Sequence, residues 1–563
     1  CCLFDAGIAM PIATGTPMQS QLDPRFYYLA NFRQALTWLQ KRYADLLSEA
    51  EHEFVRQFFA LDTPSQALLV RMIMRKGSHF RLSKLSYEEI GCARLAATPL
   101  LEAGWVRHDA ELSLEELFKL LRKDEVLQHL AGHGSRKSQN KSELLAQLTE
   151  TCAEPRAFAA WCPGSEEQIV SLTIDALCER LRLMFFGNLR QDWSEFVLAE
   201  LGIFRYERVE LTPDSRAFRH RADVDCYLHL QRSREQFEAG EPLADVLQQI
   251  SALVCDTPFL AARRNKLLFR MGQQLEREAD LEGALAFYTD CRYVGARLRQ
   301  IRVLERLGRP EQAYKLTLQA IQEPENDAEA QAVERALTRL ARQLGQPLPG
   351  KAKPIPPARI DLSLPRPEAK SVEFAVKAHL HEPDAPVHYV ENSLICSLFG
   401  LLCWQAIFAP VPGAFFHPFH TAPVDLFSAD FHTQREELFA SCMAHLDSDA
   451  YKQVIRENYA AKFGIQSPFV FWAALDETLL EQALDCLPAA HLRAWFKRLL
   501  LDIKANRAGM PDLIQFWPAE QRYRMIEVKG PGDRLQDNQR RWLAFCAEHG
   551  MPVDVCYVQW ADA

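Results

Sequence analysis

Two neighbouring apolar runs near the C-terminus carry charged side chains, and this combination limits the possible folds of the chain more than any other feature. The runs span residues 512–517 and 523–529, and each has the length of one strand. Asp512 and Glu527 lie fifteen positions apart, which suits a hairpin or a twisted strand pair. Alternation with period two turns Glu527 and Lys529 to the same face. The sequence therefore predicts two adjacent strands that bring two carboxylates and an ammonium together.

This group of charges is typical of a metal-dependent phosphodiesterase site. A buried charge needs an opposite charge or a metal to offset desolvation. Carboxylate oxygens suit Mg²⁺ or Mn²⁺, the metal acidifies a water, and a lysine orients that water or stabilises developing charge. Asp512 and Glu527 are therefore predicted as catalytic metal ligands and Lys529 as a catalytic residue, and the carbonyl of Val528 could add one oxygen. The alternative is a surface hairpin with solvated ion pairs.

The residues around these strands resemble a known nuclease domain. Pro511-Asp512, a spacer and Glu527-Val528-Lys529 resemble the PD-(D/E)XK nuclease motif. The following GPGDRL, with Gln539 and Trp542 behind it, resembles the VRR-NUC domain of the Fanconi-associated nuclease family. The resemblance extends over most of the chain. It implies a structure-specific DNA nuclease with 5′ flap endonuclease and 5′ to 3′ exonuclease activity, which acts on branched or 5′ flap DNA in interstrand crosslink repair.

The resemblance also adds residues to the predicted site. Val390-Glu391 and residues 400–404 match the family pattern, which implies that Glu391 is a third metal ligand at the start of an apolar helix over 392–408. It places Arg534 at or next to the site, although a loop ion pair would explain that residue equally. Gln539 lies on the next helix, where its amide could reach the scissile phosphate or the water. Trp542, on another face of that helix, is predicted to lie in the core.

Basic residues just before the first strand could contact DNA. Lys504 and Arg507 precede the turn at 509–512 and would meet backbone phosphates, or they could equally be solvated. The whole chain has a formal charge of −9, which argues mildly against nucleic acid. Between Arg493 and Arg541, however, 11 Lys or Arg stand against 6 Asp or Glu. The predicted site therefore has a basic surrounding.

A chain of 563 residues exceeds what one core usually serves. We expect a multidomain, mainly helical protein with a C-terminal α/β PD-(D/E)XK nuclease domain. The predicted parts are an N-terminal helical domain of winged-helix-like character (1–110), a SAP-like DNA-binding module (111–150), a helical connector (151–255), TPR-like helical repeats (256–345), a Pro-rich linker (346–368) and the VRR-NUC nuclease domain (369–563).

Three of these parts depend on local patterns. Residues 112–148 read as helix, glycine-containing loop and helix, which resembles a SAP motif whose Arg136, Lys137 and Lys141 would face phosphates; a plain helical hairpin with a solvated basic loop is the alternative. Gly272 and Ala284 have the spacing of packing positions in a TPR-like helix pair. Residues 345–367 are dense in proline, which favours a polyproline II connector.

Cysteine usage and hydropathy bear on the compartment. The 15 cysteines have no regular spacing, which is typical of buried thiols in a reducing cytoplasm. The longest apolar runs, such as 397–411, fall short of the roughly 20 residues that span a bilayer. No ubiquitin-binding zinc-finger pattern is present near the N-terminus, so the chain resembles a bacterial form. We expect a cytoplasmic, nucleoid-associated protein without a membrane segment.

Two other functions stay open at this stage. A restriction-like or RNA-directed nuclease would use the same PD-(D/E)XK core. A non-catalytic scaffold that binds DNA junctions would use the SAP-like and TPR-like helices alone.

Overall fold

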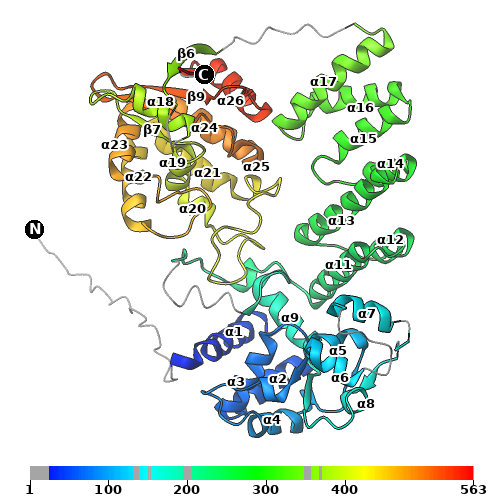
Figure 1. Ribbon diagram of the computed structural model, residues 1–563. Coiled ribbons are helices and arrows are strands. Elements are labelled where there is room, and N and C mark those ends of the chain that lie inside the picture. The colour runs from blue at the N-terminus through cyan, green and yellow to red at the C-terminus, as the bar shows by residue number, and fades with distance from the viewer. Residues whose placement is uncertain are drawn as a thin grey trace, which may run out of the picture. The chain divides into compact units, whose positions relative to one another are not determined.

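The computed structural model describes residues 24–130, 139–149, 151–152, 154–193, 205–347, 357–366 and 371–561 (Figure 1). The chain divides into two compact units, residues 1–201 and 202–563. Helices dominate both units, and the second also contains a five-stranded sheet. The expectation of a mainly helical, multidomain protein with a C-terminal α/β domain is confirmed. Within the described ranges, no helix is long and apolar enough to cross a membrane.

The first unit begins with a helical bundle closed by a small sheet. Ser48 and Glu51 form a reciprocal capping box at the start of α2, and the Asp62 side chain caps α3. Strand β5 pairs antiparallel with both β1 and β2, although it comes from the stretch predicted as a connector. The elements are η1 (Pro24–Phe26), α1 (Tyr27–Tyr43), α2 (Glu49–Ala60), α3 (Thr63–Ile73), β1 (His79–Arg81), η2 (Leu82–Lys84), α4 (Ala93–Glu102), β2 (Val106–Arg107), β5 (Ile169–Leu172) and α9 (Asp175–Phe186).

Aromatic residues of α9 belong to the core of this bundle. Phe185 and Phe186 are buried, and their rings pack against Trp193 at centroid distances of 5.7 and 5.4 Å. These rings are therefore core residues rather than exposed base-stacking platforms. Phe196 and the rest of 194–204 lie outside the described residues.

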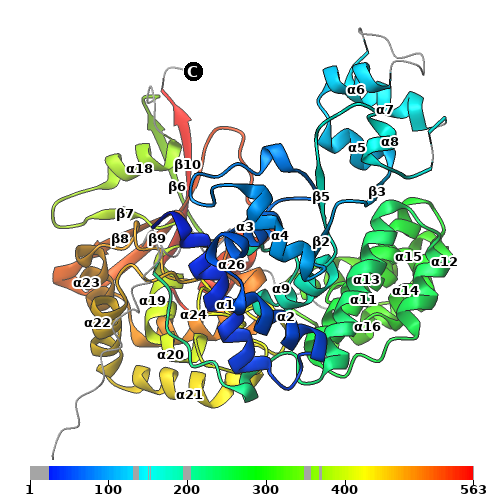
Figure 2. The same cartoon turned by 90° about the horizontal axis from the view of Figure 1, so that it is seen from below.

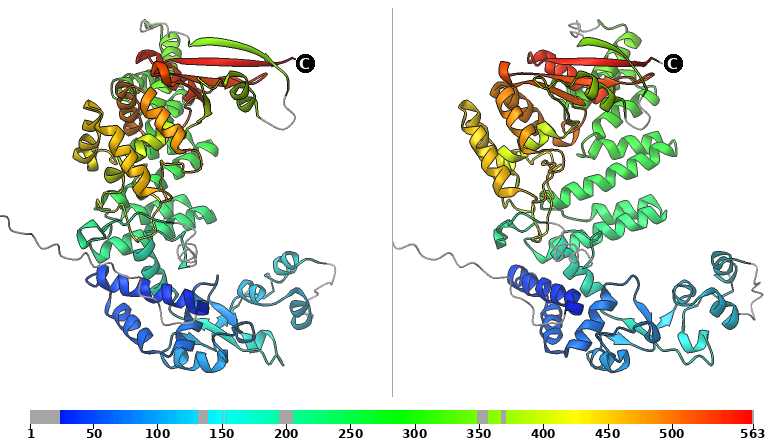
Figure 3. Two further views of the ribbon diagram at one scale, coloured as in Figure 1. Left: turned by 90° about the vertical axis from the view of Figure 1, so that its left-hand side faces the viewer. Right: turned by 60° about the vertical axis from the view of Figure 1, so that its left-hand side comes forward.

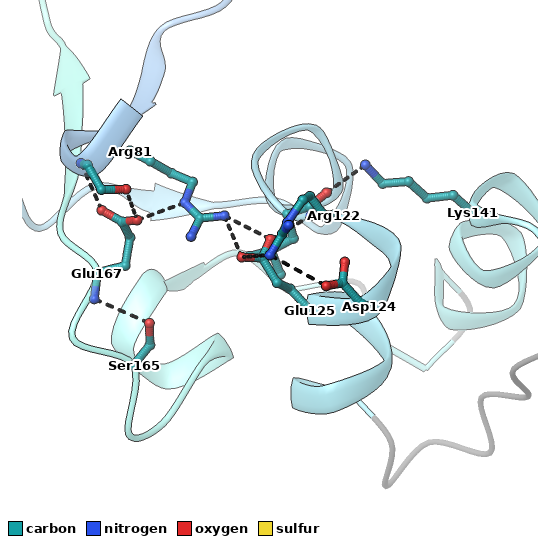
Figure 4. A network of polar contacts seen from close by, with 9 residues as sticks. Arg81, Arg122, Asp124, Glu125, Lys141, Ser165 and Glu167 are labelled. Atoms are coloured by element: carbon teal, nitrogen blue, oxygen red, sulfur yellow. Dashed lines mark hydrogen bonds and ion pairs between the residues drawn. The ribbon is translucent and has the colours of Figure 1, made fainter. Parts of the chain in front are cut away.

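A small helical module is inserted between β2 and β5. It consists of β3 (Glu111–Leu112), α5 (Leu114–Leu120), α6 (Lys123–His129), α7 (Lys141–Thr149), β4 (Arg156–Ala157) and α8 (Phe158–Trp161). Strands β3 and β4 pair antiparallel and close the module beyond the predicted end at 150. Arg81 on β1 forms ion pairs with Glu125 of α6 at 2.8 Å and with Glu167 at 2.9 Å (Figure 4). These contacts join the module to the sheet of the helical bundle.

The second unit starts with a series of helical hairpins. A Cβ added to Gly272 would lie 2.8 Å from Cε1 of Tyr288. The ring of Tyr288 on α14 therefore packs directly against the main chain of α13 at Gly272. The hydroxyl of Tyr288 donates to Oε2 of Glu276 at 3.2 Å. Figure 1 shows the later helices stacked in consecutive pairs. The elements are η5 (Pro213–Ser215), α11 (Arg221–Ala239), α12 (Leu243–Ser251), α13 (Pro258–Arg277), α14 (Leu281–Asp290), α15 (Ala296–Arg306), α16 (Pro310–Gln322) and α17 (Asp327–Leu344).

The predicted Pro-rich linker over 346–368 is wrong for part of its length. Residues Ala358–Leu364 form strand β6, which pairs parallel with β10 from Ala358↔Asp554 to Leu364↔Trp560. Ile360, Leu362 and Leu364 alternate along the strand and face an apolar core, because a strand presents every second side chain to one face. The prolines flank this segment and leave its interior free to pair.

The five-stranded sheet of the second unit has the order β6-β10-β9-β8-β7. Strands β6, β10 and β9 run parallel, whereas β8 and β7 pair antiparallel with their neighbours. Figure 3 shows β6 and β10 side by side at one edge. The strands are β6, β7 (Val387–Tyr389), β8 (Leu513–Trp517), β9 (Arg522–Lys529) and β10 (Val553–Trp560).

Two apolar cores cover the two faces of this sheet. The smaller core includes Val376 of α18 with Ile526 and Val528 of β9. The larger core combines Met525 of β9 with residues of α19 and α24 on the other face. Figure 2 labels these two helices near β8 and β9. The helices and 3₁₀ turns of the domain are α18 (Val372–Leu380), α19 (Leu394–Leu402), α20 (Trp404–Ile407), η6 (Thr433–Arg435), α21 (Glu436–Ala444), η7 (His445–Asp447), α22 (Ala450–Lys462), α23 (Glu477–Cys486), α24 (Ala489–Leu501), α25 (Ile503–Asn506), η8 (Pro518–Glu520) and α26 (Asp537–Glu548).

Candidate active site

The two predicted strands form an antiparallel pair that places Asp512 beside the end of β9. Strands β8 and β9 pair from Leu513↔Ile526 to Trp517↔Arg522, and η8 with Gln521 in a left-handed conformation connects them. Asp512 immediately precedes β8. Its Oδ2 accepts a hydrogen bond from the main-chain N–H of Val528 at 2.7 Å. A carboxylate from one strand is thus attached to the residue between Glu527 and Lys529 of the next.

Glu527 and Lys529 share one face of β9, as their alternation predicts. Ile526 and Val528 belong to the smaller core on the opposite face. The ammonium of Lys529 lies 2.7 Å from Oε1 of Glu527. Glu527 is 1% exposed, and Asp512 and Lys529 are each 7% exposed. The reading of these residues as a solvated surface hairpin is therefore wrong, because all three charges are buried in the domain.

Burial and mutual repulsion make both carboxyls hold protons more tightly than usual. Desolvation and, to a smaller extent, the neighbouring charge of Asp512 raise the pKa of Glu527 to about 7, although Lys529 acts in the opposite direction. Desolvation likewise raises the pKa of Asp512 to about 6, although the Val528 N–H acts in the opposite direction. The charge of Glu391 raises the pKa of both groups. Electrostatically, the three carboxylates form one cluster.

Glu391 reaches this cluster from a turn and not from the helix that the sequence predicts. Asn392 has a φ of +53°, and its side-chain oxygen accepts from the N–H of Met510 at 3.1 Å. Helix α19 begins only at Leu394, and a second short helix, α20, follows after Cys403. The expected continuous helix over 392–408 is therefore wrong. The Asn392 contact instead joins this turn to the residues that precede Asp512.

The carboxylate of Glu391 is exposed and engaged by its neighbours. It accepts hydrogen bonds from the hydroxyl of Tyr389 and, at 3.2 Å, from the side-chain amide of Asn392. Within the described ranges, no three His, Cys, Asp or Glu side chains are arranged to hold one metal ion. Glu391 would have to turn from Tyr389 toward Asp512 and Glu527 to complete a three-carboxylate set.

The donors present nevertheless fit a hard divalent cation. Asp512 and Glu527 offer buried carboxylate oxygens without a neighbouring thiolate or imidazole ligand among the residues of this cluster, and such oxygens suit hard cations. A cation between them would also offset the repulsion that raises their pKa values. The N–H of Val528 is bound to Asp512. A metal contact from its carbonyl stays a prediction.

The loop after Lys529 and the helix behind it position the remaining predicted residues. Asp533 accepts from the N–H of Gly530 at 3.0 Å and closes the loop, while Arg534 is exposed. The side-chain oxygen of Gln539 accepts from the N–H of Gln536 at 2.9 Å, as part of a capping box on α26. Its oxygen thus has a structural partner, and a contact with the scissile phosphate stays a prediction. Trp542 is buried, which confirms its place in the core.

Two predicted DNA contacts near α25 differ in their surroundings. Lys504 is exposed. The guanidinium of Arg507 donates to the carbonyl of Pro468 at 3.2 Å and lies 5.8 Å from the ring centroid of Phe427. Arg507 therefore has a packing role of its own, and its contact with phosphate stays a prediction.

The basic residues predicted in the SAP-like module are only partly described. Arg136 and Lys137 lie outside the described residues. The ammonium of Lys141 donates to the carbonyl of Leu121 at 2.7 Å, between α7 and the end of α5 (Figure 4). This contact gives Lys141 a structural role within the module, and its predicted contact with DNA is not tested by it.

Two side chains near the carboxylates were not anticipated. Glu373, in the first turn of α18, raises the pKa of Asp512 by its charge. Tyr389, at the end of β7, hydrogen-bonds Glu391, which raises the pKa of the tyrosine. Tyr389 stands two positions before Glu391, so the alternation of a short strand could have indicated it. Nothing in the sequence around Glu373 distinguishes it from an ordinary helix-start acid.

Sequence comparisons match three segments of the chain to known domain families. These are the "VRR-NUC domain" over 447–560, the "FAN1, HTH domain" over 26–107 and the "Fanconi anemia-associated nuclease SAP domain" over 111–161. The first segment contains Asp512, Glu527 and Lys529 but not Glu391. The third agrees with a module that closes after 150.

Individual proteins are similar over nearly the whole chain. The Fanconi-associated nuclease 1 homolog of Pseudomonas aeruginosa is 55% identical over 97% of this chain and 98% of its own length. Human Fanconi-associated nuclease 1 is 25% identical over 99% of this chain and 65% of its own length. A crystal structure of paFAN1 bound to 2nt 5′ flap DNA with gap is 56% identical, with a TM-score of 0.88 over 96% of this chain and 99% of that chain.

Proposed function

Because the chain belongs to the Fanconi-associated nuclease family, and is thus a DNA-hydrolysing nuclease dependent on divalent metal, we propose that it cuts 5′ flap DNA with Mg²⁺ or Mn²⁺. The proposed metal ligands are Glu391, Asp512 and Glu527, with the carbonyl of Val528 as a further oxygen. Lys529 is the proposed catalytic residue that orients the attacking water or stabilises developing charge. The choice between Mg²⁺ and Mn²⁺ is part of the proposal.

One observation carries this assignment of the site. Asp512, Glu527 and Lys529 are buried together at the ends of two paired strands, with a 2.7 Å ion pair and a 2.7 Å hydrogen bond linking them. Two buried carboxylates with raised pKa values weaken the fold of the metal-free chain. Carboxyl groups with shifted pKa values are concentrated at functional sites, where the chemistry requires them, so this arrangement supports a catalytic role.

The chain's own groups divide the work of phosphodiester hydrolysis. A divalent cation bound at this cluster supplies Lewis acidity for the phosphate oxygens and lowers the pKa of a water. The main-chain N–H of Val528 holds one carboxylate oxygen of Asp512, which orients the other oxygen toward the cluster. Lys529, held at Glu527, presents N–H donors that can orient the attacking water or stabilise charge on the phosphate. The exposed Glu391 would break its hydrogen bond with Tyr389 in order to join Asp512 and Glu527 as a metal ligand.

Recognition of the DNA is proposed to come from dispersed phosphate contacts. The exposed Lys504 and Arg534 flank the site on either side of the strand pair. Arg507 and Gln539 would add contacts next to them. The SAP-like module, with Arg136, Lys137 and Lys141, would add phosphate contacts to the duplex. The relative bound to a 5′ flap with a gap supports branched DNA as the substrate class.

The cellular role follows from the same family membership. We propose 5′ to 3′ exonuclease action from the first incision and a part in the repair of interstrand crosslinks. A bacterial cytoplasm, with the protein on the nucleoid, is the proposed location. These are expectations for this chain that cleavage assays and a crosslink-sensitivity test of a deletion strain would examine.

A substrate comparison tests the proposal directly. We expect the purified chain with Mn²⁺ to cut a 5′ flap faster than a 3′ flap, a palindromic duplex or an RNA hairpin of equal length. Preferential cutting of the duplex or of the RNA would support a restriction-like or RNA-directed nuclease instead. Binding of the flap without cleavage in Mg²⁺, Mn²⁺ or both would support a non-catalytic scaffold.

A further inference from the structure

An aromatic ring lies exposed beside the carboxylate cluster. Phe374, in the first turn of α18, is 42% exposed. Its ring stacks on Tyr389 of β7 with a centroid distance of 5.3 Å and an interplanar angle of 26°. Stacked rings of this kind cover one face and leave the other for a partner. Phe374 therefore presents an open aromatic face beside the carboxylates.

The two rings are tied to the active site by direct contacts. The hydroxyl of Tyr389 donates to the carboxylate of Glu391. Glu373, the neighbour of Phe374, is close enough to Asp512 for its charge to affect that carboxyl. The start of α18 also meets the loop after Lys529, since a Cβ placed on Gly530 would lie 3.6 Å from Cγ1 of Val372. The Phe374 ring thus lies next to the proposed metal ligands.

A cation completes the surface. Lys377 lies one helical turn after Phe374, with its ammonium 6.0 Å from the ring centroid. An aromatic face beside a cation is the combination with which proteins hold single-stranded nucleic acid, because bases stack on the ring and the cation attracts the backbone. A nucleobase next to the scissile phosphate is the occupant that fits.

We propose that Phe374 stacks on a nucleobase within two nucleotides of the scissile phosphate, supported from behind by Tyr389, while Lys377 attracts an adjacent phosphate. This inference rests on the proposed function of the site as a DNA nuclease. Stacking fixes the register of the strand, so the phosphate is held at the carboxylates. Phe374 is thus a substrate-positioning residue, and its contact tolerates any base sequence because every base has a π face.

Substitutions at Phe374 combined with abasic DNA test the contact. The substrate is a 5′ flap that carries a single abasic nucleotide at each position, in turn, from two before to two after the incision. We expect Phe374→Ala and Phe374→Leu to lower the single-turnover rate at subsaturating enzyme by about 10-fold on intact DNA, whereas Phe374→Trp keeps it within about 2-fold. One abasic position should lower the wild-type rate by a similar factor and leave the Phe374→Ala rate almost unchanged. That coupling identifies the stacked base.

Controls separate this inference from the function on which it rests. Phe463→Ala removes another exposed ring, at 53% exposure, which packs on Tyr459 and Trp472 instead, and it should leave the rate unchanged. Melting temperatures of all variants report folding. The stacking proposal is overturned if Phe374→Leu cuts as fast as wild type. It is also overturned if each abasic nucleotide lowers the rates of wild type and of Phe374→Ala by the same factor. If wild-type protein with Mn²⁺ leaves every flap intact, the proposed function itself fails.

Discussion

The main-chain N–H of Val528 donates a 2.7 Å hydrogen bond to Oδ2 of Asp512, and this contact fixes one carboxylate of the site to the strand that carries the other. Glu527 and Lys529 flank Val528 on the opposite face of β9 and are paired at 2.7 Å. The spacing of these three charges is therefore set by sheet geometry and not by loops. Sites on rigid elements hold reacting groups more accurately than sites on loops.

Removing either buried charge should abolish cleavage and spare DNA binding. We expect Asp512→Asn and Glu527→Gln to lower the single-turnover rate by at least about 10³-fold, because each removes a metal ligand with its charge. Flap affinity should change by less than about 3-fold, since binding depends on dispersed phosphate contacts. Glu520→Gln, at the far end of the same strand pair, is the matched control and should cut normally. Residual cutting within 10-fold of wild type in Asp512→Asn would refute the site.

The stability of the metal-free protein should fall as the pH rises. The folded pKa values of Asp512 and Glu527, about 6 and about 7, lie above their ordinary values, so the folded chain binds protons that the unfolded chain has lost. This contribution to stability is present at low pH and is lost as the pH rises toward 7, by an amount on the order of a few kcal/mol at most. We expect Mn²⁺ to raise the melting temperature more at pH 8 than at pH 5.5, because metal and protons compete for the same oxygens.

The Asp512→Asn, Glu527→Gln double variant isolates this effect from histidines that titrate elsewhere. Subtracting its melting temperatures from those of wild type leaves the contribution of the two carboxyls at each pH. The difference should favour the variant increasingly from about pH 4 to about pH 7 and change little above that. A difference that is flat between pH 5.5 and pH 8 would contradict the assigned direction of both pKa values.

The strand pair was predictable from the sequence because its chemistry is local. Alternation along 523–529 sets which side chains share a face, and any sheet made of that run must place Glu527 beside Lys529. Strand β6 was missed although Ile360, Leu362 and Leu364 alternate in the same way. Its prolines suggested a connector, and its stability comes from pairing with β10, almost 200 positions later in the chain. Long-range pairing overrode the local preference.

The turn before α19 was misjudged for a related reason. The apolar run after Glu391 has helical composition, but Asn392 adopts a left-handed conformation and bonds to Met510, a contact between distant segments. The role of Glu391 was inferred from resemblance, and its partner Tyr389 lies on β7, whose pairing with β8 is a contact between distant segments. Glu373 and Phe374 could not be found at all, because α18 approaches the site only through tertiary packing against β7 and β9.

A buried ion pair should link the helical repeats to the nuclease domain more strongly than an exposed one. Arg498 of α24 is buried against the rings of Trp542 and Phe545 and lies 3.0 Å from Asp327 of α17. Asp327→Asn should cost about 2 to 3 kcal/mol of unfolding free energy, because it leaves a desolvated guanidinium without its counter-charge. Arg335→Gln breaks an exposed pair with Asp537, which solvent screens, and should lower the unfolding free energy clearly less than Asp327→Asn. Urea unfolding of both variants measures this, and equal costs would contradict the buried link.

Gly272 should not tolerate a side chain. A Cβ at this position would lie 2.8 Å from the ring of Tyr288, which is buried between α13 and α14. Gly272→Ala should therefore destabilise the protein by about 1 to 3 kcal/mol despite the better helix propensity of alanine. Tyr288→Leu in the same chain should recover part of this loss by removing the ring. Thermal unfolding of the two single variants and the double variant checks it, and purely additive losses would show that the two residues do not compete for space.

The basic residues of the SAP-like module should contribute to the salt dependence of DNA binding in proportion to their charge. Each phosphate contact adds roughly 0.9 to the slope of log K against log salt. Replacing Arg136 and Lys137 by Gln should thus reduce the slope by nearly two. Adding Lys141→Gln should reduce it further and also lower the melting temperature, because the Lys141 ammonium bonds the carbonyl of Leu121. Lys119→Gln, an exposed lysine on α5, is the control for a general loss of charge. If the triple variant keeps the wild-type slope in fluorescence anisotropy titrations, the module does not bind DNA through these residues, and Lys141 serves only to hold α7 against α5.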